Sequence, residues 1–323
     1  MTFATIGSNF IVHRFALAAK LHDNLAYGAV YSRSQDTGQE LADQYGVAKV
    51  YTSLEALALD PDIDFVYVAS PNAVHAEQSI LMMKHGKHVL CEKPITSHAR
   101  ELEEMERVAR ENNVMLMEAM KSVYCPGYEA VRTNLHKLGP VRNVTLNFLQ
   151  YTPCYEAYQK GMATNQFNPA LSNCALVDTG VYTIHMLLAL FGKPKKFQAN
   201  AIMLSNGMDA AGTISCVYDD FLATLIYSKL ATYEGNQIQG EQAAMIIDKI
   251  SDIKHITIKY RDDREDEIIP IKKHPVMYYE IGVFLEAIKK GEQGDLLKIS
   301  KLQMAFLDEA RTQLGIVFPA DNK

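Results

Sequence analysis

The hydrophobic and polar positions of the chain follow two patterns, and the change falls near residue 121. Before it, short apolar runs alternate with longer amphipathic stretches. Short apolar runs bounded by turn residues are typical of buried strands, whereas apolar residues three and four apart are typical of helices. The predicted strands are residues 3–6, 25–31, 64–69, 87–91 and 114–117, and the predicted helices are residues 11–21, 37–45, 74–85 and 98–112. This alternation predicts an α/β domain with a doubly wound parallel sheet of the Rossmann type.

Beyond residue 121 one strongly apolar helix is predicted at residues 176–191, and strand-like runs follow without long helices between them. The predicted strands are residues 141–151, 196–204, 212–218, 222–229, 243–248 and 255–260, and helices at 278–290 and 301–313 end the chain. This pattern predicts an α+β domain on an open, mainly antiparallel sheet with one solvated face. We therefore expect two domains, residues 1–121 and 122–323, with the C-terminal helix able to pack back on the first.

Composition and charge exclude several classes of protein. No apolar run approaches the roughly 20 residues of a membrane helix, and the first residues lack the basic region and cleavage site of a signal peptide. We therefore expect a cytoplasmic protein without a membrane partner. The net charge of -6 argues against nucleic acid as the main partner. The five cysteines form no CxxC pair or Cys/His cluster, so neither disulfides nor a metal site is expected.

The turn after the first predicted strand is similar to the glycine-rich loop of a dinucleotide fold. Gly7 permits a tight turn, and the helix that begins near Phe10 and Ile11 presents amide groups and a positive dipole end to a pyrophosphate. The fingerprint is incomplete because Asn9 stands at the second glycine position and Val12 at the third. We expect Asn9 to preserve the turn by adopting left-handed backbone angles. An ordinary strand-to-helix turn stays open as the alternative.

The end of the second predicted strand bears on the choice between NAD and NADP. An acidic side chain at this place accepts hydrogen bonds from the ribose of NAD, but no carboxylate precedes Asp36 here. Arg33 could instead pair with a 2′-phosphate, and Ser32 and Ser34 could donate hydrogen bonds to it. These residues favour NADP over NAD. The alternative is that Arg33 is a solvated loop residue.

Polar residues follow the third and fourth predicted strands, at the edge where open α/β sheets bind ligands. A lysine there, Lys93, could hydrogen-bond the oxygen of an alcohol or carbonyl substrate beside the nicotinamide. A surface turn is the alternative for an isolated Lys-Pro pair. The cofactor contacts predicted at this edge are Ser70, Pro71, Asn72, His75, Glu92 and Lys93.

Two strings of residues at these strand ends resemble the glucose-fructose oxidoreductase, inositol dehydrogenase and rhizopine-catabolism family (Gfo/Idh/MocA). They are Ser-Pro-Asn-Ala-Val-His at residues 70–75 and Gly-Lys-His-Val-Leu-Cys-Glu-Lys-Pro at residues 86–94, and the resemblance also covers residues 118–126 and 168–192. It implies an NAD(P)-dependent oxidoreductase that transfers a hydride to or from a sugar-like or other small hydroxyl or carbonyl substrate. It also implies a homodimer or homotetramer formed through the C-terminal sheet.

In that family the second domain supplies an acid-base residue from an Asp-x-Gly-x-His or Asp-x-Gly-x-Tyr segment. This chain has the tyrosine form, from Asp178 to Tyr182, which resembles dihydrodiol and xylose dehydrogenases. On a helix these two residues, four apart, would share one face. The resemblance implies that Tyr182 exchanges the hydroxyl proton, that Lys93 polarises the oxygen and favours the phenolate, and that Asp178 orients the substrate. Without the resemblance, Tyr182 would be an ordinary helix residue, and His185 is expected to be structural.

The chain departs from the family pattern on the expected substrate side. The departures are Ser172, Asn173 and Cys174 in place of a glycine run, and Lys121 and Val123 where relatives often carry Trp and Arg. They leave two alternatives open. One is a nucleotide-binding sensor or regulatory protein without turnover, and the other is a lyase or glycosidase assisted by NAD.

Overall fold

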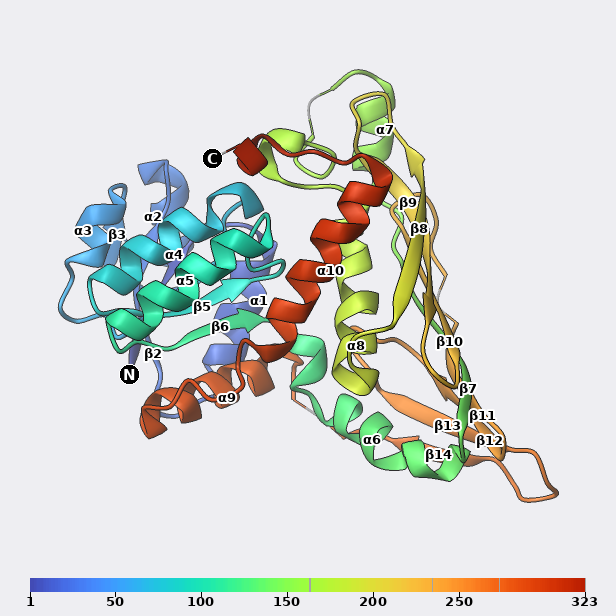
Figure 1. Cartoon of the computed structure of the whole chain (residues 1–323). Helices are drawn as coiled ribbons and strands as arrows, with labels where there is room; N and C mark the ends of the chain where they lie inside the picture. The colour runs from blue at the N-terminus through green and yellow to red at the C-terminus, as the bar shows by residue number, and fades with distance from the viewer. Residues whose placement is uncertain (163, 234, 273, 323) are drawn as a thin grey trace. The chain divides into compact units, whose positions relative to one another are not determined.

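The computed structural model describes residues 1–162, 164–233, 235–272 and 274–322. The chain divides into two units, each with its own sheet (Figure 1). The first unit comprises Met1–Met120 and His274–Lys301, and the second comprises Lys121–Lys273 and Leu302–Lys323. The domain bounds predicted from the sequence stay a prediction.

The first unit is built on a six-stranded parallel sheet in the order β3-β2-β1-β4-β5-β6. The strands are β1 (Thr2–Ile6), β2 (Ala26–Tyr31), β3 (Lys49–Tyr51), β4 (Phe65–Val68), β5 (His88–Glu92) and β6 (Leu116–Ala119). The strand order reverses between β1 and β4. In such sheets the carboxyl ends of the two central strands flank the ligand-binding crevice.

Helices cover this sheet because their apolar faces pack on its buried side chains. They are α1 (Phe10–Ala19), α2 (Gln35–Tyr45), α3 (Leu54–Ala58), η1 (Asn72–Val74), α4 (His75–Lys84), α5 (Ala99–Glu111) and α9 (Met277–Lys290). Phe15 of α1 stacks on Tyr67 of β4 at a centroid distance of 3.8 Å. Phe284 of α9 meets Phe65 of β4 edge-on at 5.4 Å. Helix α9, although it lies late in the sequence, therefore shares the core of the N-terminal sheet.

The second unit is built on an eight-stranded sheet in the order β14-β13-β12-β11-β7-β10-β9-β8. The strands are β7 (Val141–Leu149), β8 (Lys196–Met203), β9 (Asp209–Val217), β10 (Leu222–Ser228), β11 (Asn236–Gly240), β12 (Ala243–Ile247), β13 (His255–Tyr260) and β14 (Glu267–Pro270). Most neighbouring strands run antiparallel, and β7 runs parallel to β10. The predicted fold class is confirmed.

Helix α8 (Val181–Phe191) contacts β7 and β10 and covers one face of this sheet (Figure 1). The other helices are η2 (Lys121–Val123), α6 (Pro126–Asn134), η3 (Leu135–Leu138), α7 (Cys154–Gln159), η4 (Pro169–Leu171), η5 (Leu176–Gly180), α10 (Lys298–Leu314) and η6 (Pro319–Asn322). The helical run Pro169–Phe191 is long and apolar enough to cross a membrane, but 78% of its most apolar window is buried inside the protein. Such burial is typical of a core helix.

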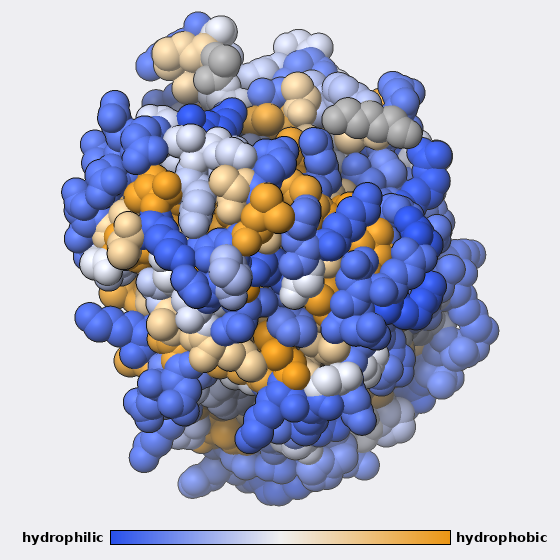
Figure 2. Space-filling view, turned by 90° about the vertical axis from the view of Figure 1, so that its left-hand side faces the viewer, coloured by the Kyte–Doolittle hydropathy of each residue, from blue (hydrophilic) through white to orange (hydrophobic). Residues whose placement is uncertain are grey.

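Figure 2 shows one face of the molecule, on which hydrophobic groups are scattered among hydrophilic ones. The exposed apolar side chains of the first unit include Leu17 and Leu21 of α1 and Leu59 after α3. Single apolar side chains of this kind are normal on a protein surface and do not mark an interface.

Candidate functional site

The loop between β1 and α1 needs glycine at its first position. Gly7 has a φ of +113°, a conformation that side chains rarely adopt, and a Cβ there would lie 2.7 Å from the carbonyl oxygen of Ala69. Its amide donates a hydrogen bond to the carbonyl oxygen of Tyr31 at 3.2 Å. The turn is therefore pressed against the end of β4, as a nucleotide loop requires.

Asn9 keeps this turn in a way that the sequence did not predict. The expected left-handed conformation is wrong, because Asn9 has a φ of -81° and an extended backbone. Its Oδ1 accepts a hydrogen bond from the Ile11 amide at 3.0 Å, and its Nδ2 donates to the Ala69 carbonyl at 2.8 Å. Asn9 thus caps α1 and ties it to β4. The next residue, Phe10, is 70% exposed.

Hydroxyl groups and a guanidinium gather where β2 ends. Ser32 is buried, and its Oγ accepts a hydrogen bond from the Ser34 amide at 3.4 Å. The Oγ of Ser34 accepts from the Thr37 amide, also at 3.4 Å, and caps α2. Arg33 between them is exposed. This donor set contains no carboxylate and fits a phosphate on the adenosine ribose better than a bare hydroxyl.

His75 connects the end of β4 to the turn after β5. The side chain is fully buried, and its two ring nitrogens face the carbonyl oxygens of Pro94 at 3.0 Å and Ser70 at 2.8 Å. Burial lowers the pKa of His75. Ser70 itself donates to Gln78 Oε1 at 2.6 Å, and Pro71 precedes η1, which begins at Asn72. The ring of His75 thus positions backbone, and a direct contact with a cofactor stays a prediction.

Two carboxylates hold the backbone around Lys93. Glu92 accepts hydrogen bonds from the Tyr67 hydroxyl at 2.5 Å and from the amide of Lys93 at 3.2 Å. Glu118, at the end of β6, is fully buried and accepts from the Ile95 amide at 3.0 Å and the Ser300 hydroxyl at 2.6 Å. Glu118 was not predicted as a site residue, although a carboxylate directly after the predicted buried strand 114–117 was a usable signal.

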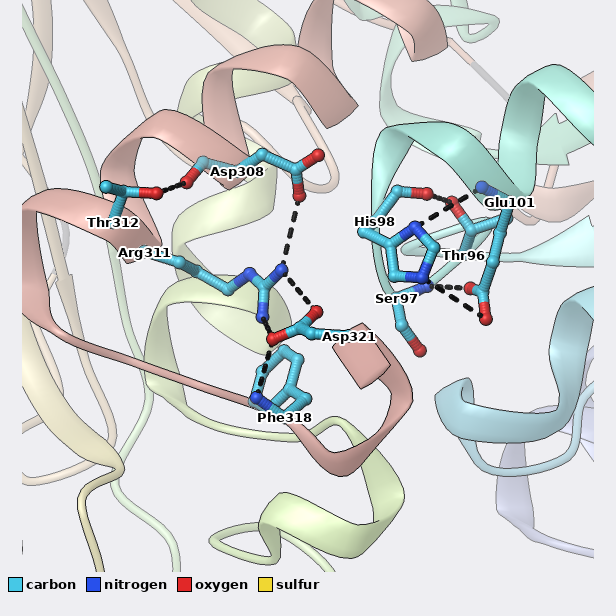
Figure 3. A network of polar contacts seen from close by, with 9 residues as sticks. All are labelled: Thr96, Ser97, His98, Glu101, Asp308, Arg311, Thr312, Phe318 and Asp321. Carbon is cyan, nitrogen blue, oxygen red and sulfur yellow. Dashed lines mark hydrogen bonds and ion pairs between the residues drawn. The ribbon is translucent and has the colours of Figure 1, made fainter. Parts of the chain in front are cut away.

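The segment after the lysine turn is fixed by the start of α5 (Figure 3). His98 is the N-cap residue and accepts a hydrogen bond from the Glu101 amide at 3.3 Å, while Glu101 accepts from the Ser97 amide at 2.8 Å. This is a reciprocal arrangement of the capping-box kind. The Thr96 hydroxyl adds a bond to the His98 carbonyl at 3.0 Å. Residues 92–101 therefore form a continuously bonded segment on both sides of Lys93.

In the second unit, Asp178 lies in a π-helical turn, and Tyr182 lies in the first turn of α8. The helix predicted at residues 176–191 is present, and its first turn is π-helical. The buried carboxylate of Asp209 accepts the Leu176 amide at 3.1 and 3.2 Å, and burial raises the pKa of Asp209. Single π-turns inside helices occur frequently at functional sites.

Tyr182 is largely buried and lies between an aromatic ring and a cation. Its ring stacks on Phe148 of β7 at a centroid distance of 4.7 Å and an interplanar angle of 20°. The ammonium of Lys121 lies over the Tyr182 ring, 5.9 Å from its centroid. One of the residues that depart from the family pattern is thus in contact with the predicted acid-base residue.

Asp178 is paired with a cation that the sequence analysis missed. Its Oδ2 accepts a hydrogen bond from the ammonium of Lys229, which directly follows β10. Lys229 ended a strand that was predicted from its apolar residues, so its charge gave no sign that it faces Asp178. The only signal in the sequence was that a lysine is the last residue of a predicted apolar strand.

The other departures lie in the segment that precedes the π-turn. Ser172 is buried with a φ of +52°, so it adopts the left-handed conformation that a glycine would favour. The amide group of Asn173 donates to the Asn165 carbonyl at 3.2 Å. Cys174 is fully buried, and burial raises the pKa of its thiol. Val123 ends η2.

His185 is a structural residue, as expected. Its Nδ1 lies 2.6 Å from Gln303 Oε1 in the core between α8 and α10. Elsewhere in the second unit, Arg311 of α10 forms two 2.9 Å hydrogen bonds to Asp321 and holds the C-terminal turn (Figure 3). Over the described residues, no three His, Cys, Asp or Glu side chains are grouped so that they could hold a metal ion.

Comparisons with known proteins agree with this geometry. Residues 1–120 match the family described as "Oxidoreductase family, NAD-binding Rossmann fold", and residues 133–247 match the Gfo/Idh/MocA C-terminal domain. The chain is 42% identical to scyllo-inositol 2-dehydrogenase (NADP(+)) IolU of Bacillus subtilis (strain 168), over 99% of this chain and 98% of the relative. It is 28% identical to trans-1,2-dihydrobenzene-1,2-diol dehydrogenase of Xenopus tropicalis, over 97% and 96%.

Solved structures share the fold across both units. The 3-ketoreductase KijD10 of Actinomadura kijaniata, in complex with NADP and TDP-benzene, has a TM-score of 0.87 at 22% identity, over 97% of each chain. Levoglucosan dehydrogenase, in complex with NADH and levoglucosan, has a TM-score of 0.86 at 16% identity, over 98% of this chain and 97% of that one. The predicted family and the predicted enzyme class are confirmed. The chain belongs to the Gfo/Idh/MocA family of NAD(P)-dependent oxidoreductases.

Proposed function

We propose that this protein is an NADP-dependent dehydrogenase that interconverts a hydroxyl group and a ketone on a cyclic polyol. The observation that carries the proposal is the 42% identity, over almost the full length of both chains, to an NADP-dependent scyllo-inositol 2-dehydrogenase. The Glu92-Lys93-Pro94 turn and the Asp178–Tyr182 segment support it, because they supply a cation, a carboxylate and a phenol. Oxidation of a secondary alcohol needs such groups at the reacting oxygen and its neighbours.

The residues at the carboxyl ends of β1 and β2 fit the cofactor. Gly7, Asn9, Phe10 and Ile11 form a close-fitting turn at the start of α1, where helix amide groups favour a pyrophosphate. Ser32 and Arg33 would hold the 2′-phosphate, since no carboxylate of the strand end opposes it. We propose NADP rather than NAD on this ground. Ser70, Pro71, Asn72 and His75 would line the nicotinamide side together with Glu92 and Lys93.

The chemistry is divided among three side chains. Bound NADP supplies the hydride acceptor. Tyr182, as phenolate, would take the proton of the substrate hydroxyl, while Lys93 donates a hydrogen bond to the same oxygen. Asp178 would accept a hydrogen bond from a neighbouring substrate hydroxyl and so orient the ring. As the carbonyl forms, the hydride of the carbon–hydrogen bond would pass to the nicotinamide, and the proton on Tyr182 would return to solvent. This requires Lys93 of the first unit and Tyr182 of the second to reach one substrate atom.

The oligomer and the compartment complete the proposal. Strand β8 carries the exposed apolar side chains Ile202 and Met203, and Leu222 of β10 is also exposed. A second copy of the chain would cover the open face of this sheet and form a homodimer or homotetramer. We also propose that the enzyme works in the cytoplasm.

A turnover assay with matched variants tests the proposal. Purified protein is incubated with NADP or NAD and a panel of cyclitols, sugars and diols, and reduced nicotinamide is followed by absorbance. We expect turnover with NADP and a cyclitol, and a loss of at least 100-fold in kcat for Lys93→Ala and for Tyr182→Phe. Lys20→Ala, at the exposed C-cap position after α1, should retain full activity. Near wild-type kcat in Lys93→Ala would refute the catalytic assignment.

A further inference from the structure

Lys229 is an enclosed cation whose ammonium points at the proposed substrate-orienting carboxylate. Its side chain is 2% exposed, whereas that of Asp178 is 31% exposed. The ammonium donates to Asp178 Oδ2, donates to Gln166 Oε1 at 3.1 Å, and lies 5.6 Å from the ring centroid of Phe167. The ammonium of this ion pair is therefore buried, whereas its carboxylate is partly exposed to solvent.

The surroundings of Lys229 hold the cation in place. Its amide donates to the Ala210 carbonyl at 2.9 Å, and its carbonyl accepts from the Thr152 amide at 3.1 Å. The Phe167 ring beside its ammonium is met edge-on by Tyr155 and Tyr158, at centroid distances of 6.3 and 5.9 Å. A buried ammonium without a counterion is strongly unfavourable, so Lys229 needs Asp178 ionised and close by.

We propose that Lys229 is a positioning and specificity-determining residue that acts through Asp178. It fixes the carboxylate rotamer and offsets its negative charge, so that the pair accepts a hydrogen bond and attracts a cation less strongly. The substrate group recognised there is then an uncharged hydroxyl, not a protonated amine. This inference rests on the proposed function, since it concerns the substrate that Asp178 would orient.

Electrostatics gives the proposal a measurable consequence. Loss of the Lys229 charge would make the surroundings of Asp178 one unit more negative at a partly enclosed surface, where charge interactions are stronger than in water. Such a site favours an ammonium group over a hydroxyl of the same shape. Removal of the Lys229 charge should therefore weaken the use of a polyol and improve the relative use of its amino analogue. A merely structural role would lower both activities by the same factor.

The experiment compares scyllo-inositol with scyllo-inosamine, in which one hydroxyl is replaced by an amine, as substrates of the full-length protein with NADP. We expect Lys229→Met to lower kcat/KM for scyllo-inositol at least tenfold, and to shift the ratio of the two kcat/KM values toward the amine at least tenfold. Lys195→Met is the matched control, because Lys195 pairs with Asp219 where both side chains are exposed. It should change neither value.

If the single variant Lys229→Met does not fold, the double variant Lys229→Met/Asp178→Asn tests the inference in its place. It removes both charges together, so it should fold and bind NADPH, and its low activity should show the wild-type preference for the hydroxyl. An unchanged ratio in a folded Lys229→Met protein, or an amine preference in the double variant, overturns the inference. Absence of wild-type turnover on any cyclitol overturns the proposed function instead, and the two failures are thus distinguishable.

Discussion

Replacement of Gly7 by alanine is the sharpest test of the nucleotide loop. The φ of +113° is unfavourable for any residue with a side chain, and the new Cβ would lie 2.7 Å from the Ala69 carbonyl oxygen and 3.1 Å from its carbon. Both neighbours are backbone atoms of β4's end, which cannot rotate away. The loop must therefore move, and the distance between Asn9 Nδ2 and the same carbonyl, now 2.8 Å, must lengthen.

The magnitude follows from these two contacts. A non-glycine residue held in such a backbone conformation costs about 1–3 kcal/mol, and a lost hydrogen bond adds about 0.5–1.5 kcal/mol. We therefore expect Gly7→Ala to disfavour the binding-competent loop by about 1.5–4.5 kcal/mol in total. At 1.4 kcal/mol per tenfold, the Kd for NADPH should rise by a factor of roughly 10 to 1,600.

The assay separates loop geometry from general backbone strain. NADPH binding is measured by titration of cofactor fluorescence, and the unfolding midpoint is measured on the same samples. Gly86→Ala is the control, because Gly86 also has a positive φ, +76°, but a Cβ there would meet nothing within 4 Å. It should lower stability by about 1–2 kcal/mol and leave the Kd for NADPH unchanged.

The result that would refute this reasoning is a Gly7→Ala protein that binds NADPH within twofold of wild type. The nucleotide would then lie elsewhere, and the contact of Gly7 with Ala69 would be ordinary packing. An equal loss of affinity in Gly86→Ala would refute it as well, since the effect would then follow from lost stability of the unit and not from the loop.

Three further predictions concern the same unit. Asn9→Ala removes a helix cap worth about 1 kcal/mol and should lower both the unfolding midpoint and NADPH affinity, whereas Asn9→Gly should retain more affinity; paired melting and titration experiments check this. Arg33→Ala should weaken NADPH at least tenfold more than NADH in calorimetric titrations. Burial lowers the pKa of His88, whose Nδ1 accepts the Met115 amide at 2.8 Å. The folded protein accommodates the neutral imidazole, so the contribution of His88 to stability is fully present above pH 6.5 and is lost as the pH falls. The melting temperature should therefore drop on acidification, and His88→Gln should make it depend less on pH.

Elements with a clear apolar pattern could be predicted from the sequence, and elements without one could not. The buried strands β4 and β5 stood out as continuous apolar runs, and helix α5 stood out because its apolar residues lie three and four apart. Strand β3 (Lys49–Tyr51) and helix α3 (Leu54–Ala58) were missed because they are too short to show a period. Strand β14 (Glu267–Pro270) is half-exposed, and its two isoleucines lie between a charged segment and a proline, so the run was too short to be predicted as a strand.

The residues of the candidate site also fall into two groups. Some lie in a recognisable motif, and the others matter because of a contact with a residue distant in the sequence. Lys93 and Tyr182 were found because each lies in a string that resembles a known family. Glu118 and Lys229 were missed, since their importance lies in hydrogen bonds to residues 23 and 51 positions away. Local sequence contains no information on such partners. The backbone of Asn9 was wrongly predicted for a related reason, as its side chain bonds decide its conformation.

In each unit, side chains of opposite charge hold the residue that would act on the substrate. Glu92 and the fully buried Glu118 accept hydrogen bonds from the backbone on the two sides of Lys93, and the buried ammonium of Lys229 pairs with Asp178. Burying a charge is energetically unfavourable, and such charges are retained where they position functional groups before the substrate binds. Because these carboxylates accept hydrogen bonds from the amides of Lys93 and Ile95, the lysine turn should keep its shape with or without cofactor. The site would then bind substrate with little rearrangement, which is the arrangement expected of an enzyme that turns over and not of a sensor that must change shape on binding.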